Sequence, residues 1–404
     1  MSFSRFLKTG HIGTLISSFI YSDMSFMVWI MLGPLAVYIS LDLELTEAQQ
    51  YTMVTLPLLA GVLFRIPMGI LVDRFAPKQT GMIAQAIVIV VLFFAYISNV
   101  DSITGIYVVG LALGLAGTSM AVALPLSSRW YPDEYQGVVL GIAGAASSGT
   151  VFAAAFAPML AEAYGWRSVF GFAIIPLLVT LVLFYYLARD SHDRPQPQKI
   201  GHYWHVLGDV DSWWFMLFYG LTFGGVIALS SVMVLYFHLQ YGLEPVTAGY
   251  YTAACILAGT ALRPVGGWMA DRYGGIRSMQ NLFAVTAVCM FVVSFSIPYT
   301  WLVVILLIVG TASLGMGSGA VFQLVPLRFR KEVGAVTGMV GAAGGLGGFF
   351  LAWFMFQSKQ LTNDFSLGFF MFSILSVLSL YGIHRVKSRW RTTWGSGALT
   401  SARV

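Results

Sequence analysis

Two arginines inside apolar stretches are the residues of this chain best suited to do chemistry. Arg65 lies in AGVLFRIPMGILVD, and Arg263 lies in AGTALRPVGGWMAD. Each arginine precedes an Asp-Arg pair by eight residues, and the two arginines, like the two acids Asp73 and Asp271, are 198 residues apart. A register that is kept across half the chain indicates two related halves.

The depth of these arginines suggests what they bind. Eight helical residues span roughly 12 Å, so if Asp73 and Asp271 mark a membrane surface, both arginines approach the middle of a hydrocarbon core about 30 Å thick. An arginine there costs about 2.5 to 3.5 kcal/mol on insertion scales. A small anion bound between the two arginines would explain why both lie within the membrane. A guanidinium is planar and permanently charged, and its forked N–H donors suit a small planar oxyanion.

The composition predicts an all-α integral membrane protein. The 404 residues are 58% hydrophobic and only 10% charged, which is too apolar for an ordinary soluble domain. Apolar runs about twenty residues long exclude the shorter alternating strands of a β-barrel. The first run, from Ile12 to Ile39, is too long for a cleaved signal peptide. The formal charge of +5 is scattered in short clusters, so no nucleic-acid partner is expected.

Glycine, proline and charge interrupt the apolar runs and predict twelve transmembrane helices in two pseudo-symmetric six-helix halves. The expected spans are 14–40, 47–71, 80–98, 103–126, 137–160, 168–187, 213–238, 246–270, 279–297, 301–325, 333–356 and 366–384. Residues 189–211 are polar and proline-bearing, and are the expected cytoplasmic linker between an N-terminal half (1–188) and a C-terminal half with a short cytoplasmic tail (212–404).

The basic residues predict the orientation of the helices. Eighteen of the 22 lysines and arginines fall on the side of the two termini, two fall on the opposite side, and two lie within spans. The positive-inside rule therefore places both termini in the cytoplasm, and the expected location is the cell inner (plasma) membrane. Cys255 and Cys289 lie in apolar runs with no CxxC pattern and are read as packing residues, so neither a metal nor a cofactor is expected.

The loops after the second and eighth spans repeat an acid followed by basic residues. GILVDRFAPK contains Asp73 and Arg74, and GWMADRYGGIR contains Asp271 and Arg272. A single copy would be read as a solvated positive-inside loop. Two copies at matching offsets favour a conformational latch, in which ion pairs to a neighbouring helix form in one state and break in the other.

Spans five and eleven share a glycine-rich pattern. GVVLGIAGAASSGTVF begins at residue 137, GAVTGMVGAAGGLGGFF begins at residue 334, and three glycines in each match at an offset of 197. Glycine and alanine at spacings of three and four residues make a helix face without large side chains, which another backbone or a ligand can approach closely. Ordinary helix packing would explain either copy alone.

Together these features resemble the nitrate/nitrite porter family of the major facilitator superfamily. The resemblance rests on the two arginines, the paired DR loops, FIYSDMSFMVWIMLGPL in span one, GAVFQLVPLRFRKEVG in span ten and the span-eleven glycines. It covers nearly the whole chain and is closest to the bacterial assimilatory-type members. It implies the major facilitator fold and alternating-access transport of nitrate or nitrite by a monomer in the lipid bilayer, with no enzymatic activity.

The resemblance also implies a binding site. The family clamps its anion with two arginines, which here are Arg65 and Arg263, and lines the site with span-seven aromatic residues, which here are Tyr219 and Phe223. The family's span-five signature usually has an asparagine, for which this chain has the shorter Ser147, and this puts the preference between nitrate and nitrite in question. The expected substrate-binding set is completed by Gly144, Gly341 and Gly344.

Asp23 is the plainest ionisable residue within a span besides the arginines, and it is the candidate for coupling. A buried acid in a span can carry a proton, which favours proton-coupled uptake. The alternative role for Asp23 is a structural acid that accepts hydrogen bonds or partners an arginine. A nitrate/nitrite exchanger would need no titratable carrier, because two facing arginines resist closure unless an anion neutralises them.

Other functions fit the sequence less well. A major facilitator carrier for an organic anion or a drug would need more polar partners than these spans contain. A membrane enzyme is disfavoured because HExxH, a histidine-ligand pair and a nucleotide loop are all missing from the sequence. A nitrate-sensing receptor would need a domain that passes on the signal, and the tail after His384 is only 20 residues long.

Overall fold

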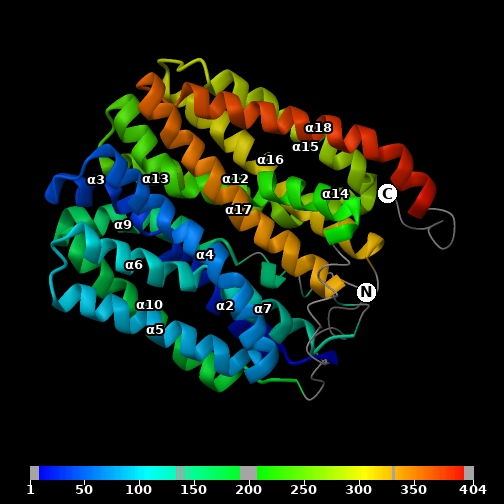
Figure 1. Ribbon diagram of the computed structural model, residues 1–404, viewed down its shortest axis with the longest axis horizontal. Helices are drawn as coiled ribbons and strands as arrows, with labels where there is room; N and C mark the ends of the chain where they lie inside the picture. The colour runs from blue at the N-terminus through cyan, green and yellow to red at the C-terminus, as the bar shows by residue number, and fades with distance from the viewer. Residues whose placement is uncertain are drawn as a thin grey trace. The chain divides into compact units, whose positions relative to one another are not determined.

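The twelve-helix, all-α fold predicted from the sequence is confirmed in a computed structural model of the protein (Figure 1). The structure describes residues 9–132, 135, 139, 142–144, 146–191, 207–329 and 333–394. Within these residues the secondary structure is helical, and eleven helical segments are long and apolar enough to cross a membrane. The remaining predicted span, the eighth (246–270), is divided between two shorter helices.

The chain divides into two compact units, which are described separately. The first unit comprises Met1–Gln198 with Glu244–Tyr250, and the second comprises Lys199–Leu243 with Tyr251–Val404. The helices that begin in the N-terminal half of the chain are α2 (Ile12–Trp29), α3 (Leu32–Asp42), α4 (Glu47–Phe75), α5 (Pro77–Ile97), α6 (Ile103–Ala116), α7 (Ser119–Ser128), α9 (Gly149–Tyr164) and α10 (Trp166–Leu187). Those that follow are α12 (Val210–Tyr241), α13 (Pro245–Ala261), α14 (Arg263–Tyr273), α15 (Gly275–Val293), α16 (Thr300–Arg328), α17 (Val333–Thr362) and α18 (Ser366–Trp394).

Capping residues explain where several of these helices begin and end. Thr46 and Gln49 form a capping box at the start of α4, and Asp209 caps the start of α12 with its side chain. Gly242 ends α12 in the left-handed conformation that glycine adopts without strain. Because α12 begins at Val210, the last two residues of the predicted linker 189–211 belong to this helix. The predicted limits of the two halves remain a prediction.

Three predicted spans are interrupted where the sequence analysis expected continuous helices. Span one breaks between α2 and α3, span four between α6 and α7, and span eight at Leu262 between α13 and α14. Pro264 follows the last break, and a proline has no backbone N–H to donate, so it is tolerated in the first turn of a helix rather than in its interior. Span eight therefore restarts at Arg263.

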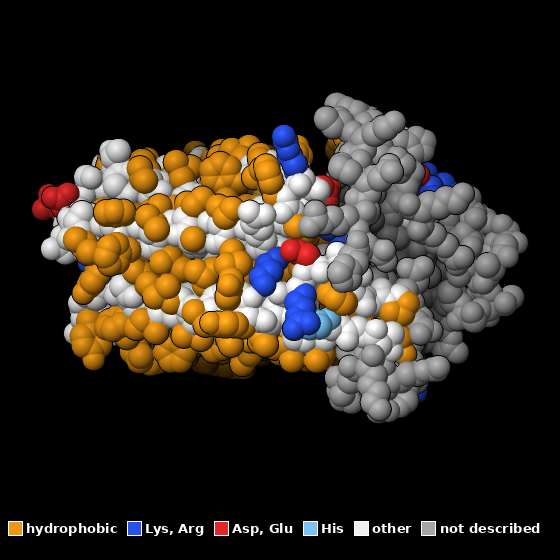
Figure 2. Space-filling model, turned by 90° about the horizontal axis from the view of Figure 1, so that it is seen from below, with side chains coloured by type: hydrophobic (Ala, Val, Ile, Leu, Met, Phe, Trp, Pro, Cys, Tyr) orange, Lys and Arg blue, Asp and Glu red, His pale blue; other side chains and the backbone are white. Residues whose placement is uncertain are grey.

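The outward faces of α5 and α10 are apolar, as lipid contact requires. Both helices expose large hydrophobic side chains, among them Ile87 and Phe94 on α5 and Ile175 and Val179 on α10. Figure 2 shows one face of the molecule on which hydrophobic side chains form a broad area, while basic side chains gather toward one end. These features are those of a multi-pass membrane protein.

The centre of the second unit is α12, whose side chains are almost all buried. It packs against α16, α17 and α18, which run beside it in Figure 1. The crossing of α12 and α17 is so close that a Cβ atom on Gly347 would overlap the carbonyl oxygen of Gly220. Close backbone approach at small residues is how helices associate in a membrane, so glycine is required at this crossing.

We expect Gly347→Ala to lower the melting temperature of the detergent-solubilised protein, because overpacking a close contact costs about 1 to 3 kcal/mol. The matched control is Gly338→Ala on the same helix, where a Cβ atom would meet nothing within 4 Å. Alanine is favoured over glycine in a helix by about 0.5 to 1 kcal/mol, so the control should melt at the same or a higher temperature. Equal melting of the two variants would show that the crossing tolerates a methyl group.

Candidate functional site

Arg263 begins α14 and is surrounded by aromatic side chains. It is only 8% exposed, and its Nη2 donates a hydrogen bond of 3.1 Å to the hydroxyl of Tyr219. Its guanidinium carbon lies 5.9, 5.6 and 5.8 Å from the ring centres of Tyr219, Phe223 and Phe322. Cations within about 6 Å of a ring are attracted by its π face. The buried charge is therefore held by rings and one neutral hydroxyl.

The aromatic residues around Arg263 support one another. Tyr219 and Phe223 lie one turn apart on α12 with their rings stacked, at 5.0 Å and 5°. Phe322 of α16 meets Tyr219 edge-on, at 4.7 Å and 83°. A Cβ atom on Gly344 would approach these stacked rings at 2.7 and 2.8 Å, so the absence of a side chain leaves room for them. The second unit thus brings together Arg263, Tyr219, Phe223 and Gly344, and Gly341 precedes Gly344 by three residues on α17.

Arg65, the counterpart on α4, bonds to the backbone. It is 9% exposed, and its Nη2 donates to the carbonyl oxygen of Gly117 at 3.1 Å. Gly117 lies at the break between α6 and α7. Just after the break, the N–H of Ala121 donates a hydrogen bond to the carbonyl oxygen of Thr118. The interruption of span four therefore supplies an acceptor to a buried guanidinium. Like the Tyr219 hydroxyl, this carbonyl is a neutral acceptor.

Asp23 contacts the segment that contains Ser147. Ser147 is buried in the turn directly before α9, and Gly144 is buried just ahead of it. The Oδ1 atom of Asp23 accepts hydrogen bonds from the Ser148 hydroxyl at 2.7 Å and from the Gly149 N–H at 2.6 Å. A carboxylate in this position caps the first turn of α9 and complements its dipole. This arrangement is the structural role that the sequence had left open for Asp23.

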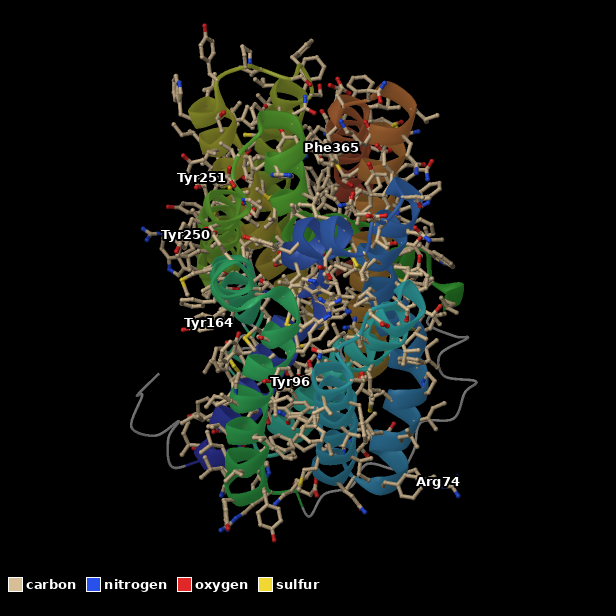
Figure 3. All side chains as sticks on the ribbon, turned by 90° about the vertical axis from the view of Figure 1, so that its left-hand side faces the viewer. Arg74, Tyr96, Tyr164, Tyr250, Tyr251 and Phe365 are labelled. Carbon is tan, nitrogen blue, oxygen red and sulfur yellow. The ribbon has the colours of Figure 1, made fainter. Side chains whose placement is uncertain are left out.

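The two copies of the predicted latch differ in their contacts. Asp73 forms an ion pair of 3.1 Å with Arg129, which follows the end of α7. Arg74 is exposed and extends away from the helices in Figure 3. In the second unit Asp271 and Arg272 are both exposed, and the Arg272 guanidinium lies 5.3 Å from the ring centre of Trp268. One copy therefore joins two helices of its unit, while a latch function remains a prediction for both.

Two features near the site were missed in the sequence analysis. Phe322 stands within the span-ten stretch GAVFQLVPLRFRKEVG without a predicted role, and the structure places its ring beside Arg263. Asp211 falls in the predicted linker and Arg328 in the same span-ten stretch, and the two form an ion pair of 2.7 Å. An acid at the first turn of a long apolar helix was the available signal, since such a charge requires a partner.

Comparisons with known proteins agree over most of the chain. Residues 18–352 match the Major Facilitator Superfamily. The chain is 32% identical over 360 residues to the "Nitrite extrusion protein" of Bacillus subtilis, covering 88% of this chain and 89% of that protein. It is 31% identical over 364 residues to the "Probable nitrate/nitrite transporter NarK2" of Mycobacterium tuberculosis, covering 89% and 92%. It is 29% identical over 398 residues to the "Probable nitrate/nitrite antiporter NarK1" of Thermus thermophilus, covering 89% and 88%.

Solved structures share the fold. The xylose transporter XylE from E. coli superimposes with a TM-score of 0.75 at 13% sequence identity, covering 94% of this chain and 98% of that chain. The nucleoside transporter NupG superimposes with a TM-score of 0.70 at 14% identity, covering 92% and 99%. At such low identity the likeness concerns the fold and carries no information on the substrate.

We expect Tyr219→Phe to lower the free energy of unfolding by about 1 to 3 kcal/mol, because a buried guanidinium loses an acceptor while the ring stack is kept. The control is Tyr250→Phe, whose exposed hydroxyl contacts only the sulfur of Met159 at 3.7 Å. Its effect should stay within about 0.5 kcal/mol. Denaturant titration of the solubilised variants measures both values, and an equal effect would mean that the hydroxyl of Tyr219 does not stabilise Arg263.

Proposed function

We propose, from the premise that this chain belongs to the nitrate/nitrite porter family of the major facilitator superfamily, that it transports nitrate, nitrite or both across a membrane. One observation carries the proposal. Arg65 and Arg263 occupy equivalent positions in the repeat, and both are buried within apolar helices. A buried positive charge in a membrane protein is costly, and binding of a small anion offsets that cost.

The proposed site clamps one anion with Arg65 and Arg263. A guanidinium has five N–H donors in a planar fork, which suits it to bind a small oxyanion. The Tyr219 hydroxyl accepts from Arg263 and can still donate its own proton to an oxyanion. The stacked ring of Phe223 excludes water, which strengthens the charge interactions. The remaining proposed lining residues are Gly144, Ser147, Gly341 and Gly344.

The proposed mechanism is alternating access driven by neutralisation of charge. Two permanent positive charges, one from each half, repel each other when the carrier is empty. An anion bound to both removes this repulsion and lowers the barrier to rocking of one half against the other. The Asp73 and Asp271 loops act in this proposal as latches that stabilise one state. We also propose that the protein is a monomer of the inner (plasma) membrane with both termini in the cytoplasm, supported by the distribution of basic residues.

Two forms of coupling follow from the site, and the contacts of Asp23 favour the second. Proton symport through Asp23 is the form expected from the sequence. The Asp23 carboxylate, however, caps α9 through Ser148 and Gly149, so each proton taken up would weaken that cap. Exchange of nitrate for nitrite requires no titratable group. One relative, from Thermus thermophilus, is named an antiporter.

We expect Arg263→Lys to lower kcat/KM for nitrate uptake about 10- to 100-fold, because lysine keeps the charge but loses the fork. Uptake of labelled nitrate into proteoliposomes at a series of concentrations measures this. Arg65→Lys should behave in the same way. The control is Arg167→Lys, since this guanidinium pairs with Asp42 at 2.7 Å outside the proposed site. Uptake by Arg263→Lys that matches the parent would contradict the arginine clamp, and a parent that takes up neither anion would contradict the function itself.

We expect nitrate uptake to be stimulated by nitrite inside the vesicles and to be indifferent to an imposed proton gradient. Asp23→Asn should then weaken the protein, by losing the charge that caps α9, without changing this dependence on internal nitrite. The assay uses the same proteoliposomes with either internal nitrite or an inward proton gradient. Accumulation driven by the proton gradient alone, and abolished in Asp23→Asn, would instead make Asp23 a proton carrier.

A further inference from the structure

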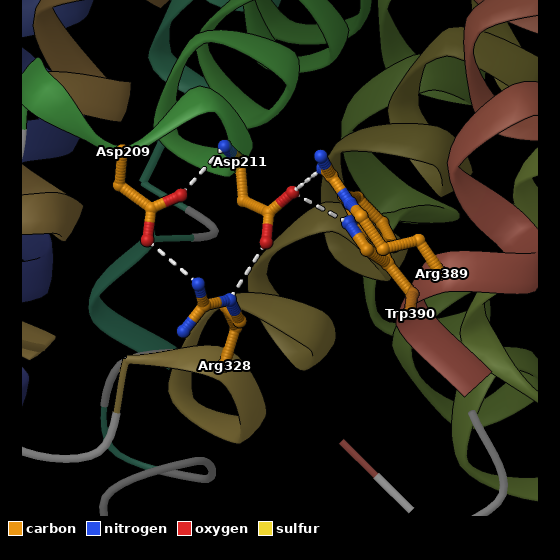
Figure 4. Close-up of polar contacts among 5 residues, drawn as sticks. All are labelled: Asp209, Asp211, Arg328, Arg389 and Trp390. Atoms are coloured by element: carbon orange, nitrogen blue, oxygen red, sulfur yellow. Dashed lines mark hydrogen bonds and ion pairs between the residues drawn. The ribbon is translucent and has the colours of Figure 1, made fainter. Parts of the chain in front are cut away.

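A group of charged side chains joins three helices at one end of the second unit (Figure 4). We call it the Asp211 clasp. Its members come from the start of α12, the end of α16 and the C-terminal part of α18: Asp209, Asp211, Arg328, Arg389 and Trp390. None of these residues belongs to the proposed anion site.

Both carboxylates of the clasp accept several bonds. The Oδ2 atom of Asp211 accepts from Arg328 Nε at 2.7 Å, and its Oδ1 atom accepts from Trp390 Nε1 at 2.7 Å and from the Arg389 guanidinium. Asp209 accepts from Arg328 Nη2 at 2.6 Å through one oxygen and from the Asp211 N–H at 2.8 Å through the other. Two carboxylates thus face two guanidiniums, and the charges of the clasp balance.

Burial makes Asp211 the critical member of the clasp. Its side chain is only 6% exposed, and Trp390 is fully buried with its indole stacked on Phe215 at 4.9 Å and 17°. Removing one partner of a buried ion pair is strongly destabilising, because the remaining charge is left uncompensated. Arg389 is 46% exposed, and such a solvated ion pair contributes little. Arg328 and Trp390 therefore fix Asp211, and through it the start of α12.

The clasp lies on the helices that surround Arg263. Asp211 precedes Tyr219 by eight residues on α12, which is roughly 12 Å. Arg328 ends α16, the helix whose Phe322 ring meets Tyr219 edge-on. The same helix packs so tightly on α14 that a Cβ atom on Gly319 would overlap the carbonyl oxygen of Arg263. The clasp holds the start of α12 to the end of α16 and so prevents α12 from sliding along its axis. This fixes the position of Tyr219 relative to Arg263.

We propose that Asp211 is a positioning residue for the anion site. Through Arg328 and Trp390 it sets the axial position of α12, so that the Tyr219 hydroxyl meets the Arg263 guanidinium. The inference rests on the proposed binding of the anion at Arg263. A positioning role for Asp211 differs from a purely structural one. In a purely structural role, loss of the clasp would lower the stability of the protein but leave its affinity for the anion unchanged.

A double-mutant cycle between Asp211 and Tyr219 tests this role. Asp211→Asn keeps the shape of the side chain and removes its charge. Because small displacements of binding groups have large effects, we expect Asp211→Asn to raise the KM for nitrate about 10-fold or more, with a smaller change in Vmax per folded transporter. In the Tyr219→Phe background the same substitution should change KM little. A KM rise of equal size in both backgrounds, or no rise in either, overturns the proposal.

The first unit offers a matched control for this cycle. Asp42 also binds an arginine and a tryptophan, accepting through Oδ2 from Arg167 Nη1 at 2.7 Å and from Trp166 Nε1 at 3.2 Å. The Asp42 side chain is 45% exposed, so Asp42→Asn should lower the melting temperature only slightly, and it should leave the KM for nitrate unchanged. If it raises KM as much as Asp211→Asn does, the effect reflects general destabilisation, and Asp211 has no positioning role.

A milder variant keeps the test decisive if Asp211→Asn does not fold. Trp390→Phe keeps an aromatic ring beside Phe215 and removes the N–H that binds Asp211, together with part of the indole. It should raise KM about 3-fold or more, consistent with loss of one charge-assisted hydrogen bond, and again only when Tyr219 is present. A lower melting temperature with an unchanged KM overturns the proposal.

Failure of the proposed function is distinguishable from failure of the clasp. A parent protein that takes up no nitrate contradicts the function. The same cycle is then measured on the free energy of unfolding. Coupling between Asp211→Asn and Tyr219→Phe supports positioning of α12, because groups that act through one another are not additive. Additive effects overturn it.

Discussion

The structure depends most on keeping two guanidinium groups charged inside apolar helices. Arginine does not lose its proton in a protein, so burial cannot be relieved by neutralisation and must be met by the surroundings. The interruption of span four meets part of this requirement, since the Gly117 carbonyl at the break accepts a hydrogen bond from Arg65. Aromatic side chains meet the requirement at Arg263. Two rings and a hydroxyl come from α12, and the third ring is that of Phe322 on α16.

The two halves meet this requirement by different chemistry, although their sequences keep one register. A backbone carbonyl can only accept, so the group facing Arg65 has nothing to offer an anion. The Tyr219 hydroxyl accepts from Arg263 and retains a proton of its own, which suits it to a site where an oxyanion arrives and leaves. Both copies of the repeat therefore contain the arginine, but they surround it with different hydrogen-bonding groups. In the proposed site, the second unit contributes more to the specificity for the anion than the first.

The sequence predicts the helices and the burial of Arg65 and Arg263 well, because both depend on local pattern and on the internal repeat. It does not predict the breaks at Leu262 and at Gly117 as interruptions of a span, although Pro264 follows the first of them. It also does not predict partners that lie far apart in the chain. Asp23 caps a helix 126 residues away, and Asp211 binds Arg328 117 residues away and Trp390 179 residues away. Residue type shows that such acids need partners, and only the fold determines which partners they find.

A permanently charged site also bears on how transport would be coupled. Under the proposed function, the charge of the site changes only when an anion binds or leaves, because neither arginine can release a proton. The empty carrier then retains two facing positive charges and is hindered from returning, whereas a carrier loaded with a counter-anion is not. Exchange therefore follows from the arginines alone, while symport needs a further group that loads a proton on each cycle. Asp23 is the acid within span one, and its carboxylate caps α9, where uptake of a proton would weaken the hydrogen bonds from Ser148 and Gly149.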